Sequence, residues 1–436
     1  MNISFSKHTL ANGLDVVIHE DHALPIVAVN VWYHVGSKNE VPGRTGYAHL
    51  FEHLMFEGSQ HYDRGYFHPL QEAGAALNGS TNADRTNYWE VMPANALELA
   101  LWMESDRMGY LLPALTDAKF ANQREVVLNE RRQNYENRPY GLAGMAIVSA
   151  LYPEAHPYHW LTIGESADIQ AATVDDMRAF FQRFYHPGNA SLALAGDIDV
   201  GTGVALAERY FAEIPGGDRP DAVTVTVPEP PAEDIRLVLE DRVELPRLYL
   251  AWHSPALFAD GDAELDLVGE VLSSGKTSRL YRALVYDQRI ATEVAASQNS
   301  RELGSFFQIV ATAAPGRTLA EVERAISKEI AALIDRGPTA AELERCLAQA
   351  EAHFLFRLQT VGGFGGKSDQ LNAYNMFLGD PGYFERDLER YRAATTEQLR
   401  RAAARWLKPN TRVVLSVVPR GRVALALTGS KAVTVS

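Results

Sequence analysis

Two histidines and a glutamate lie close together in the segment "TGYAHLFEHLMFEGS", residues 45–59. If this segment is helical, His49 and His53 stand one turn apart on one face, where both imidazoles can bind the same metal ion. Glu52 flanks that face and can handle the proton of a metal-bound water. The set is suited to zinc-assisted hydrolysis, whereas the alternative is two partly exposed histidines on an ordinary helix.

A catalytic zinc site needs a third protein ligand beside the two histidines, and one position must stay open for water. The segment "TDAKFANQREVVLNERRQNYENRP", residues 116–139, is typical of a long helix and contains Glu125 and Glu130. Either carboxylate could complete the site, and the residues by themselves do not choose between them.

The sequence also suggests where the helix and strand that position these side chains begin and end. Thr45 is suited to cap the N-terminus of a helix at 46–57, and Gly58 is suited to end it. Residues 75–93, "AALNGSTNADRTNYWEVMP", alternate as a strand does.

An extended stretch followed by a helix occurs twice in the chain. "LPIVAVNVWYHVGS" precedes the helix at 46–57, and "LPRLYLAWHSPAL" precedes "DAELDLVGEVLSSG". A segment rich in Pro, Gly and acidic residues, 215–233, lies between the two copies. We therefore predict two homologous α+β domains, 1–216 and 234–436, joined by a linker at 217–233. The second helix has only acidic and aliphatic residues at the corresponding positions, which indicates a non-catalytic scaffold domain.

Composition excludes several classes of protein. The chain has 436 residues and a net charge of −14 without a basic stripe, so a nucleic-acid partner is not expected. No apolar run approaches the roughly 20 residues of a membrane-spanning helix. The single cysteine, Cys346, rules out an internal disulfide and is predicted to be a buried structural thiol. The first residues lack the apolar core of a signal peptide, which fits either a cytoplasmic protein or one whose leader has been removed.

Two glycine-rich motifs could suggest nucleotide binding. "SSGKTS" at 273–278 and "VGGFGGKS" at 361–368 both lack the upstream glycine of a P-loop, because Glu270 and Val361 occupy that position. We interpret the first as a helix stop and the second as a flexible loop between helices.

The pentapeptide "HLFEH" resembles the inverted zinc motif His-x-x-Glu-His of the M16, or pitrilysin-like, metallopeptidases. That family places its third ligand, a glutamate, about 76 residues after the second histidine, and Glu130 follows His53 with 76 residues between them. The segments 156–164, 185–199 and 366–384 also resemble the B subgroup of this family. The resemblance covers nearly the whole chain and implies a duplicated LuxS/MPP-like metallohydrolase fold, in which each domain is a mostly antiparallel sheet packed with helices.

The resemblance also implies roles. His49, His53 and Glu130 would bind one Zn²⁺ and Glu52 would be the general base. Glu125 is a candidate for orienting a ligand, against the alternative of a solvated helix face.

The segment Asn78, Gly79 and Ser80 matches the edge strand on which the family binds its peptide substrate, with Gly79 at the position of an alanine. The alternative for this segment is an edge strand with a structural role only.

The chain departs from the family at the Arg and Tyr that bind substrate and stabilise the oxyanion. Their positions fall on Val285 and Thr292, which cannot replace them, and Arg282 and Arg289 are out of register. We therefore expect the zinc-bearing subunit of a heterodimer whose homologous partner supplies the Arg/Tyr pair. The alternative is a non-catalytic structural subunit of an M16-type complex. The resemblance to bacterial members favours a periplasmic location, provided that a leader has been removed.

Overall fold

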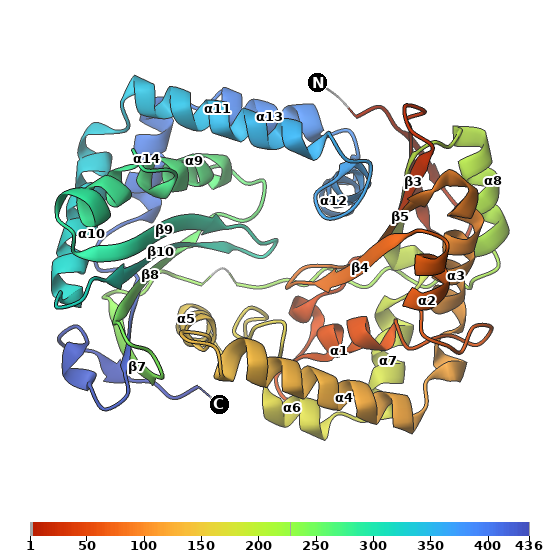
Figure 1. Cartoon of the computed structure of the whole chain (residues 1–436), viewed down its shortest axis with the longest axis horizontal. Helices are drawn as coiled ribbons and strands as arrows, with labels where there is room; N and C mark the ends of the chain where they lie inside the picture. The colour runs from red at the N-terminus through yellow and green to blue at the C-terminus, as the bar shows by residue number, and fades with distance from the viewer. Residues whose placement is uncertain (1–2, 227, 436) are drawn as a thin grey trace. The chain divides into compact units, whose positions relative to one another are not determined.

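The computed structural model describes residues 3–226 and 228–435. These residues form two compact units (Figure 1). Unit 1 contains residues up to 130, 161–223 and 353–386; unit 2 contains 131–160, 224–352 and the residues from 387 onward. Among the described residues, no helix combines the length and the apolar character that crossing a bilayer requires.

Unit 1 is built on a six-stranded sheet in the order β1-β2-β6-β3-β5-β4. Only β2 and β6 pair in parallel, and all other neighbours are antiparallel. The strands are β1 (Ser6–Thr9), β2 (Asp15–Glu20), β3 (Ile26–Tyr33), β4 (Ala76–Thr81), β5 (Thr86–Pro93) and β6 (Ala190–Gly196). The helices are α1 (Tyr47–Leu54), α2 (Phe67–Glu72), α3 (Leu97–Tyr110), α4 (Asp117–Arg131), α6 (Ser166–Ala171), α7 (Val174–Phe184), α8 (Val200–Phe211) and α12 (Lys367–Leu378).

Unit 2 repeats this topology with the strand order β12-β7-β11-β8-β10-β9. The strands are β7 (Ile235–Asp241), β8 (Arg247–Ser254), β9 (Ala291–Asn299), β10 (Ser305–Ala313), β11 (Val413–Pro419) and β12 (Lys431–Ala432). The helices are α5 (Ala143–Leu151), α9 (Asp262–Ser273), α10 (Leu319–Arg336), α14 (Thr396–Trp406) and most of α11 (Ala340–Arg357) and α13 (Phe384–Arg392). Five strands of each sheet follow one another in the same order and direction, so the predicted duplicated α+β fold is confirmed.

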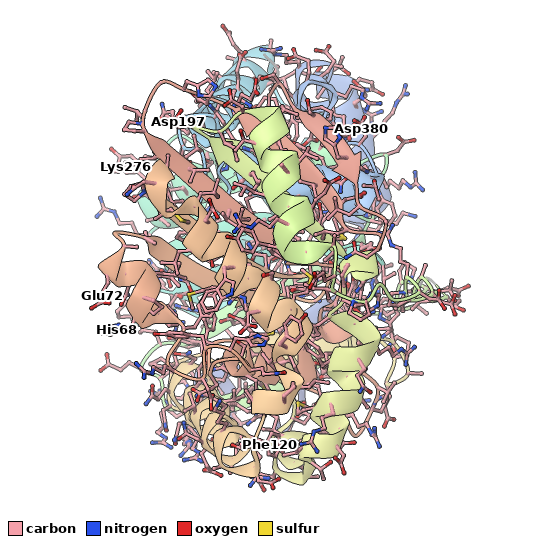
Figure 2. The ribbon with its side chains drawn as sticks, turned by 90° about the vertical axis from the view of Figure 1, so that its right-hand side faces the viewer. His68, Glu72, Phe120, Asp197, Lys276 and Asp380 are labelled. Carbon is pink, nitrogen blue, oxygen red and sulfur yellow. The ribbon has the colours of Figure 1, made fainter. Side chains whose placement is uncertain are left out.

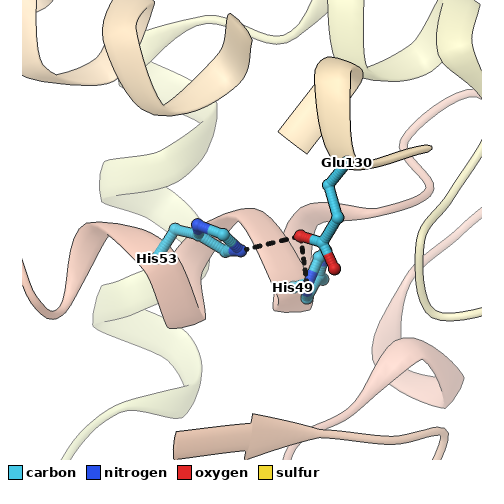
Figure 3. A group of neighbouring side chains, drawn as sticks. All are labelled: His49, His53 and Glu130. Carbon is cyan, nitrogen blue, oxygen red and sulfur yellow. Dashed lines mark ion pairs between the residues drawn. The ribbon is translucent and has the colours of Figure 1, made fainter. Parts of the chain in front are cut away.

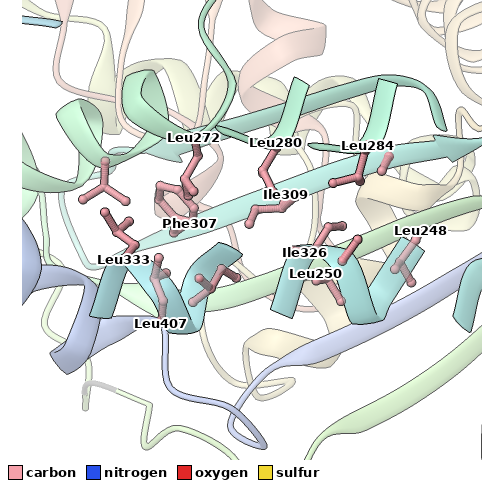
Figure 4. Packing of buried hydrophobic residues seen from close by; sticks show 14 of the residues in the cluster. Leu248, Leu250, Leu272, Leu280, Leu284, Phe307, Ile309, Ile326, Leu333 and Leu407 are labelled. Atoms are coloured by element: carbon pink, nitrogen blue, oxygen red, sulfur yellow. The ribbon is translucent and has the colours of Figure 1, made fainter. Parts of the chain in front are cut away.

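The core of unit 2 lies between its sheet and the helices α9, α10 and α14 (Figure 4). It is built from fully buried aliphatic and aromatic side chains, including Leu248, Leu250, Leu272, Phe307, Ile309, Ile326 and Leu333. Cys346 belongs to this cluster and is completely buried, as predicted. Burial raises the pKa of its thiol to about 11, so the thiolate form is scarce at neutral pH.

Each compact unit includes a helix from the other half of the chain. The apolar helix α5 packs on β8 and β11 of unit 2, and α12 packs on β3 and β6 of unit 1. The units therefore differ from the continuous segments 1–216 and 234–436. The physical reason is that a sheet face must be covered by apolar surface, and the covering helix can come from any part of the chain.

The glycine-rich segment before α12 is a loop between α11 and α12, as predicted, and at Gly362 it packs against the sheet of unit 1. A Cβ atom on Gly362 would lie 2.4 Å from the Cβ of Ala28, so only glycine fits there. The N–H of Gly365 donates to Asp369 Oδ2 at 2.8 Å. The other glycine motif ends α9 as expected, since Gly275 has a φ of +75°.

Candidate metal centre

Helix α1 carries three of the predicted site residues on one short element. Its buried face packs through Phe51 against Phe181 and Tyr185, with ring centroids 5.3 Å and 4.6 Å apart. This packing leaves His49, Glu52 and His53 on the half-buried face of the helix. Gly58, with a φ of +101°, reverses the chain four residues after the last helical residue, so α1 is shorter than the predicted 46–57.

The N-terminus of α1 is capped by a residue that the sequence did not suggest. Both carboxylate oxygens of Glu40 accept backbone N–H groups, one from Gly46 at 2.9 Å and one from Ala48 at 2.8 Å. The prediction that Thr45 caps the helix is wrong, because its hydroxyl donates to Asp168 at 2.7 Å. A negative carboxylate at this position stabilises the first turn, which carries His49.

Glu130, near the end of α4, meets both histidines of α1 (Figure 3). Its Oε2 lies 3.3 Å from Nε2 of His53 and 3.6 Å from Nε2 of His49. Zinc bonds of about 2.0–2.1 Å in a tetrahedron place neighbouring ligand atoms about 3.3–3.4 Å apart. The carboxylate oxygen therefore already lies at nearly a zinc ligand's spacing from each imidazole nitrogen, and all three ligand atoms lie within 4.8 Å of one another.

Burial and mutual charge set the protonation of the two histidines. Burial, with the adjacent His53, lowers the pKa of His49 to about 4, so its ring is neutral at pH 7 and can act as a ligand. Burial also opposes protonation of His53, but the hydrogen bond to Glu130 and the charges of Glu52 and Glu130 outweigh it and raise its pKa. Because Glu130 attracts a cation between these rings, the site suits a divalent metal that can replace the proton.

Glu52 is held beside the sheet of unit 1. Burial raises the pKa of its carboxyl, and a hydrogen bond from Thr81 of β4 and the charges of His53 and Arg85 oppose this shift. A raised pKa suits a carboxylate that must accept a proton and release it again. Thr81 was not among the predicted site residues, although it lies in the stretch 75–93 that was predicted to be a strand.

The residue of α4 that hydrogen-bonds to a histidine of the site is Gln123, not Glu125. The Gln123 side chain hydrogen-bonds to His53, and its amide also donates to Glu57. Glu125 is exposed, and the structure does not bring it to the site. At about 100° per residue, Gln123 and Glu130 share one face of α4, whereas Glu125 is turned by about 140° from Glu130. The helical period could therefore have excluded Glu125.

The predicted substrate segment lies on β4, which is the edge strand of the sheet. Asn78 Oδ1 accepts the N–H of Gly79 at 2.8 Å, and the Ser80 hydroxyl donates to Asn87 at 2.6 Å. A Cβ at position 79 would meet the rings of Tyr88 and Phe56 at 3.0 and 3.1 Å, which explains why glycine is found there. Gly79 therefore allows close packing on the side of the strand that faces α1.

Other pairs of histidine and acid do not form such a site. His68 and Glu72 lie one turn apart on α2, 3.4 Å from each other, and both project into solvent (Figure 2). Within residues 3–226 and 228–435, the two histidines of α1 with Glu130 are the one group of three or more His, Cys, Asp or Glu side chains with a spacing suited to a metal ion.

The positions of the expected Arg/Tyr pair lie in unit 2. Val285 packs partly buried against the core, and the Thr292 hydroxyl donates to the carbonyl of Thr312 at 3.4 Å. Arg282 is exposed and lies 3.6 Å from Asp287. Arg289 has a φ of +51°, a left-handed backbone conformation that is uncommon for arginine.

Family models and curated relatives match most of this chain. The family model "Insulinase (Peptidase family M16)" matches residues 15–157, and the model "Peptidase M16 inactive domain" matches residues 171–350. The chain is 31% identical to the zinc protease PqqE of Helicobacter pylori, covering 82% of this chain and 81% of that protein. It is 28% identical to the uncharacterized zinc protease ML0855 of Mycobacterium leprae, covering 77% and 75%.

Solved structures share the fold over almost the whole chain. A protease from Helicobacter pylori has a TM-score of 0.88 and 27% identity, covering 95% of this chain and 100% of that one. A peptidase M16 inactive domain from Pseudomonas fluorescens has a TM-score of 0.84 and 21% identity, covering 95% and 98%.

Proposed function

Because this chain belongs to peptidase family M16, we propose that it is a zinc-dependent endopeptidase subunit that hydrolyses peptides or unfolded segments. The observation that carries the proposal is the convergence of His49, His53 and Glu130 within 4.8 Å of one another, with Glu52 on the same helix. Two neutral nitrogens and one carboxylate form a ligand set that zinc accepts and that leaves a position for water.

His49, His53 and Glu130 would hold the metal. Zinc, when bound, supplies Lewis acidity and lowers the pKa of a coordinated water. Glu52 accepts the proton of the attacking water and then delivers it to the leaving amine of the cleaved peptide bond. A hydrogen bond from the hydroxyl of Thr81 favours the charged form of the Glu52 carboxyl, the form that accepts a proton.

The edge strand β4 supports a peptide as the substrate. In an antiparallel ladder the backbone groups of alternate residues face away from the partner strand. Because Asn82 pairs with Arg85 across the turn, the outward residues of β4 are Leu77, Gly79 and Thr81. An extended peptide could add to this edge through main-chain hydrogen bonds, which requires an unfolded segment but few specific side chains. The Asn78 side chain would have to release the N–H of Gly79 when the peptide docks.

We also propose that activity depends on a homologous partner. Oxyanion stabilisation needs donors aimed at the developing charge. Val285 has no donor, and the Thr292 hydroxyl already donates to a backbone carbonyl. A second chain with the Arg/Tyr pair would supply these groups.

The test is zinc analysis and peptide cleavage by the purified chain, with and without an Arg/Tyr-bearing homologue. We expect about one zinc per chain, little cleavage alone, and cleavage with the partner that a chelator abolishes. The Glu52→Gln variant should keep its zinc and lose turnover with the same partner. Retained turnover would exclude Glu52 as the base, and a chain that binds no zinc would favour a structural subunit instead.

A further inference from the structure

The end of β4 beside Glu52 is held by a half-buried arginine, Arg85, that lies outside the metal site. Nη1 of Arg85 donates to the carbonyl of Ser80 at 2.9 Å and to its hydroxyl at 2.7 Å. The guanidinium carbon lies 5.1 Å from the centroid of the Trp32 ring, a cation–π contact. Arg85 is therefore packed from one side and hydrogen-bonded from the other, across the turn between β4 and β5.

Ser80 is also held by a network of polar side chains on the sheet of unit 1. The Ser80 hydroxyl donates to Asn87, whose amide donates to Asp369 of α12 at 3.2 Å. Asp369 also accepts from the Trp32 indole at 2.8 Å and from the Asn30 amide at 3.2 Å. With these bonds the network joins three strands of the sheet to α12, so Ser80 has little freedom to move.

The turn that carries Arg85 is itself held in place. The N–H groups of Ser37 and Lys38 donate to the carbonyls of Asn82 and Ala83 at 3.2 and 2.9 Å. A Cβ on Gly36 would lie 2.4 Å from the Asn82 carbonyl, so this contact requires glycine. These contacts hold the turn, and the turn holds Arg85. The hydrogen bonds from the Arg85 guanidinium therefore fix the position of Ser80 at the end of β4.

The charge on Arg85 faces the general base as well as the network. Burial lowers the pKa of its guanidinium, and the carboxylates of Asp369, Glu52 and Asp84 oppose that shift. The guanidinium therefore interacts electrostatically with all three carboxylates. The residue next to Ser80 is Thr81, which donates to Glu52.

We propose that Arg85 is a positioning residue for the peptidase reaction: it fixes the end of β4 so that Thr81 holds Glu52 toward the metal and the outward backbone groups stay aligned for a peptide. This inference rests on the proposed function for its catalytic part. Its structural part, the ordering of residues 76–81, can be measured without turnover. Arg85 touches neither the three metal ligands nor, in the proposed mode, the cleaved bond.

The experiment compares the zinc-loaded full chain with its Arg85→Met and Arg85→Lys variants. Backbone hydrogen exchange of residues 76–81 is measured by mass spectrometry, with the edge strand β9 of unit 2 as an internal reference. We expect exchange in β4 to rise at least about tenfold in Arg85→Met, because one charge-assisted donor shared by two acceptors is lost. Arg85→Lys should restore part of the protection. Arg44→Met, which removes an exposed arginine paired with Asp176 at 3.1 Å in the same unit, should leave β4 unchanged.

The kinetic arm uses an unstructured fluorophore–quencher peptide with the chain and its Arg/Tyr-bearing homologue. Arg85→Met should lower kcat at least about tenfold with KM changed less than about threefold, while zinc affinity stays within about twofold. If Arg85 only stabilised the fold, Arg85→Met would lower the melting temperature, but the folded molecules would keep the kcat of the parent. Unchanged exchange in β4, or loss of the whole fold in both Arg85 variants, overturns the proposal. A wild-type pair that binds zinc but cleaves nothing overturns the proposed function, while the exchange result still decides whether Arg85 orders β4.

Discussion

Replacing Glu40 should weaken zinc binding although Glu40 does not contact the metal site. Its carboxylate is 6% exposed and accepts two backbone N–H groups of the first turn of α1, at 2.9 and 2.8 Å. Glu40→Ala leaves both donors without this partner, at a cost of about 1–3 kcal/mol each, and removes a favourable charge from the helix N-terminus worth about 0.3–1 kcal/mol. Water entering the space would offset part of this cost. We therefore expect the free energy that stabilises the first turn of α1 to fall by about 2–5 kcal/mol.

The link to zinc is His49, the third residue of this helix. Apparent affinity falls in proportion to the fraction of molecules whose site is competent to bind. If about 2 kcal/mol of the loss appears as fraying of the first turn, zinc affinity falls up to about 30-fold. Glu40→Gln, which keeps one carbonyl acceptor, should give a smaller loss.

The assay is competition with a chromophoric chelator at pH 7.5, together with hydrogen exchange of residues 44–50. Glu125→Ala is the matched control, because it removes the same charge from an exposed position on α4. Zinc affinity of Glu40→Ala within twofold of the parent, with unchanged exchange in α1, would refute the link between this cap and the metal site.

Three further predictions concern residues that the structure singles out. Gln123→Ala should lower zinc affinity about 10–100-fold by removing the support of His53, as chelator competition would show. Burial raises the pKa of Asp266 from 3.8 to about 7, so this acid favours the folded state most at low pH and its contribution is lost as pH rises through 7. Asp266→Asn should therefore be more stable than the parent in urea at pH 8, by at most about 4 kcal/mol, with the difference vanishing near pH 4. Gly362→Ala should lower the melting temperature, since its Cβ would lie 2.4 Å from that of Ala28.

The local part of the site could be predicted because it depends on the helical period. His49 and His53 share a face of any helix through residues 49–53, whatever surrounds it. The repeated order of strands and helices similarly indicated two α+β units, since the same hydrophobic pattern needs the same layers. The selection of Glu130 over Glu125 came from family resemblance, although the phase of α4 points the same way.

Other features were decided by tertiary packing. A cap from Glu40, six residues before Gly46, cannot be read from a pattern that looks for Ser, Thr, Asp or Asn next to the helix. The helices α5 and α12 each pack in the unit formed mainly by the other half of the chain. The hydrogen bond from Thr81 to Glu52 likewise joins residues that are far apart in the sequence.

The sequence by itself determined which side chains could bind zinc and accept a proton, because spacing along a helix sets which residues share a face. Only the tertiary structure decided what holds those side chains in place. The partners of a buried polar group are whichever donors the packed elements bring within hydrogen-bond distance, and that depends on how distant segments cover the same sheet.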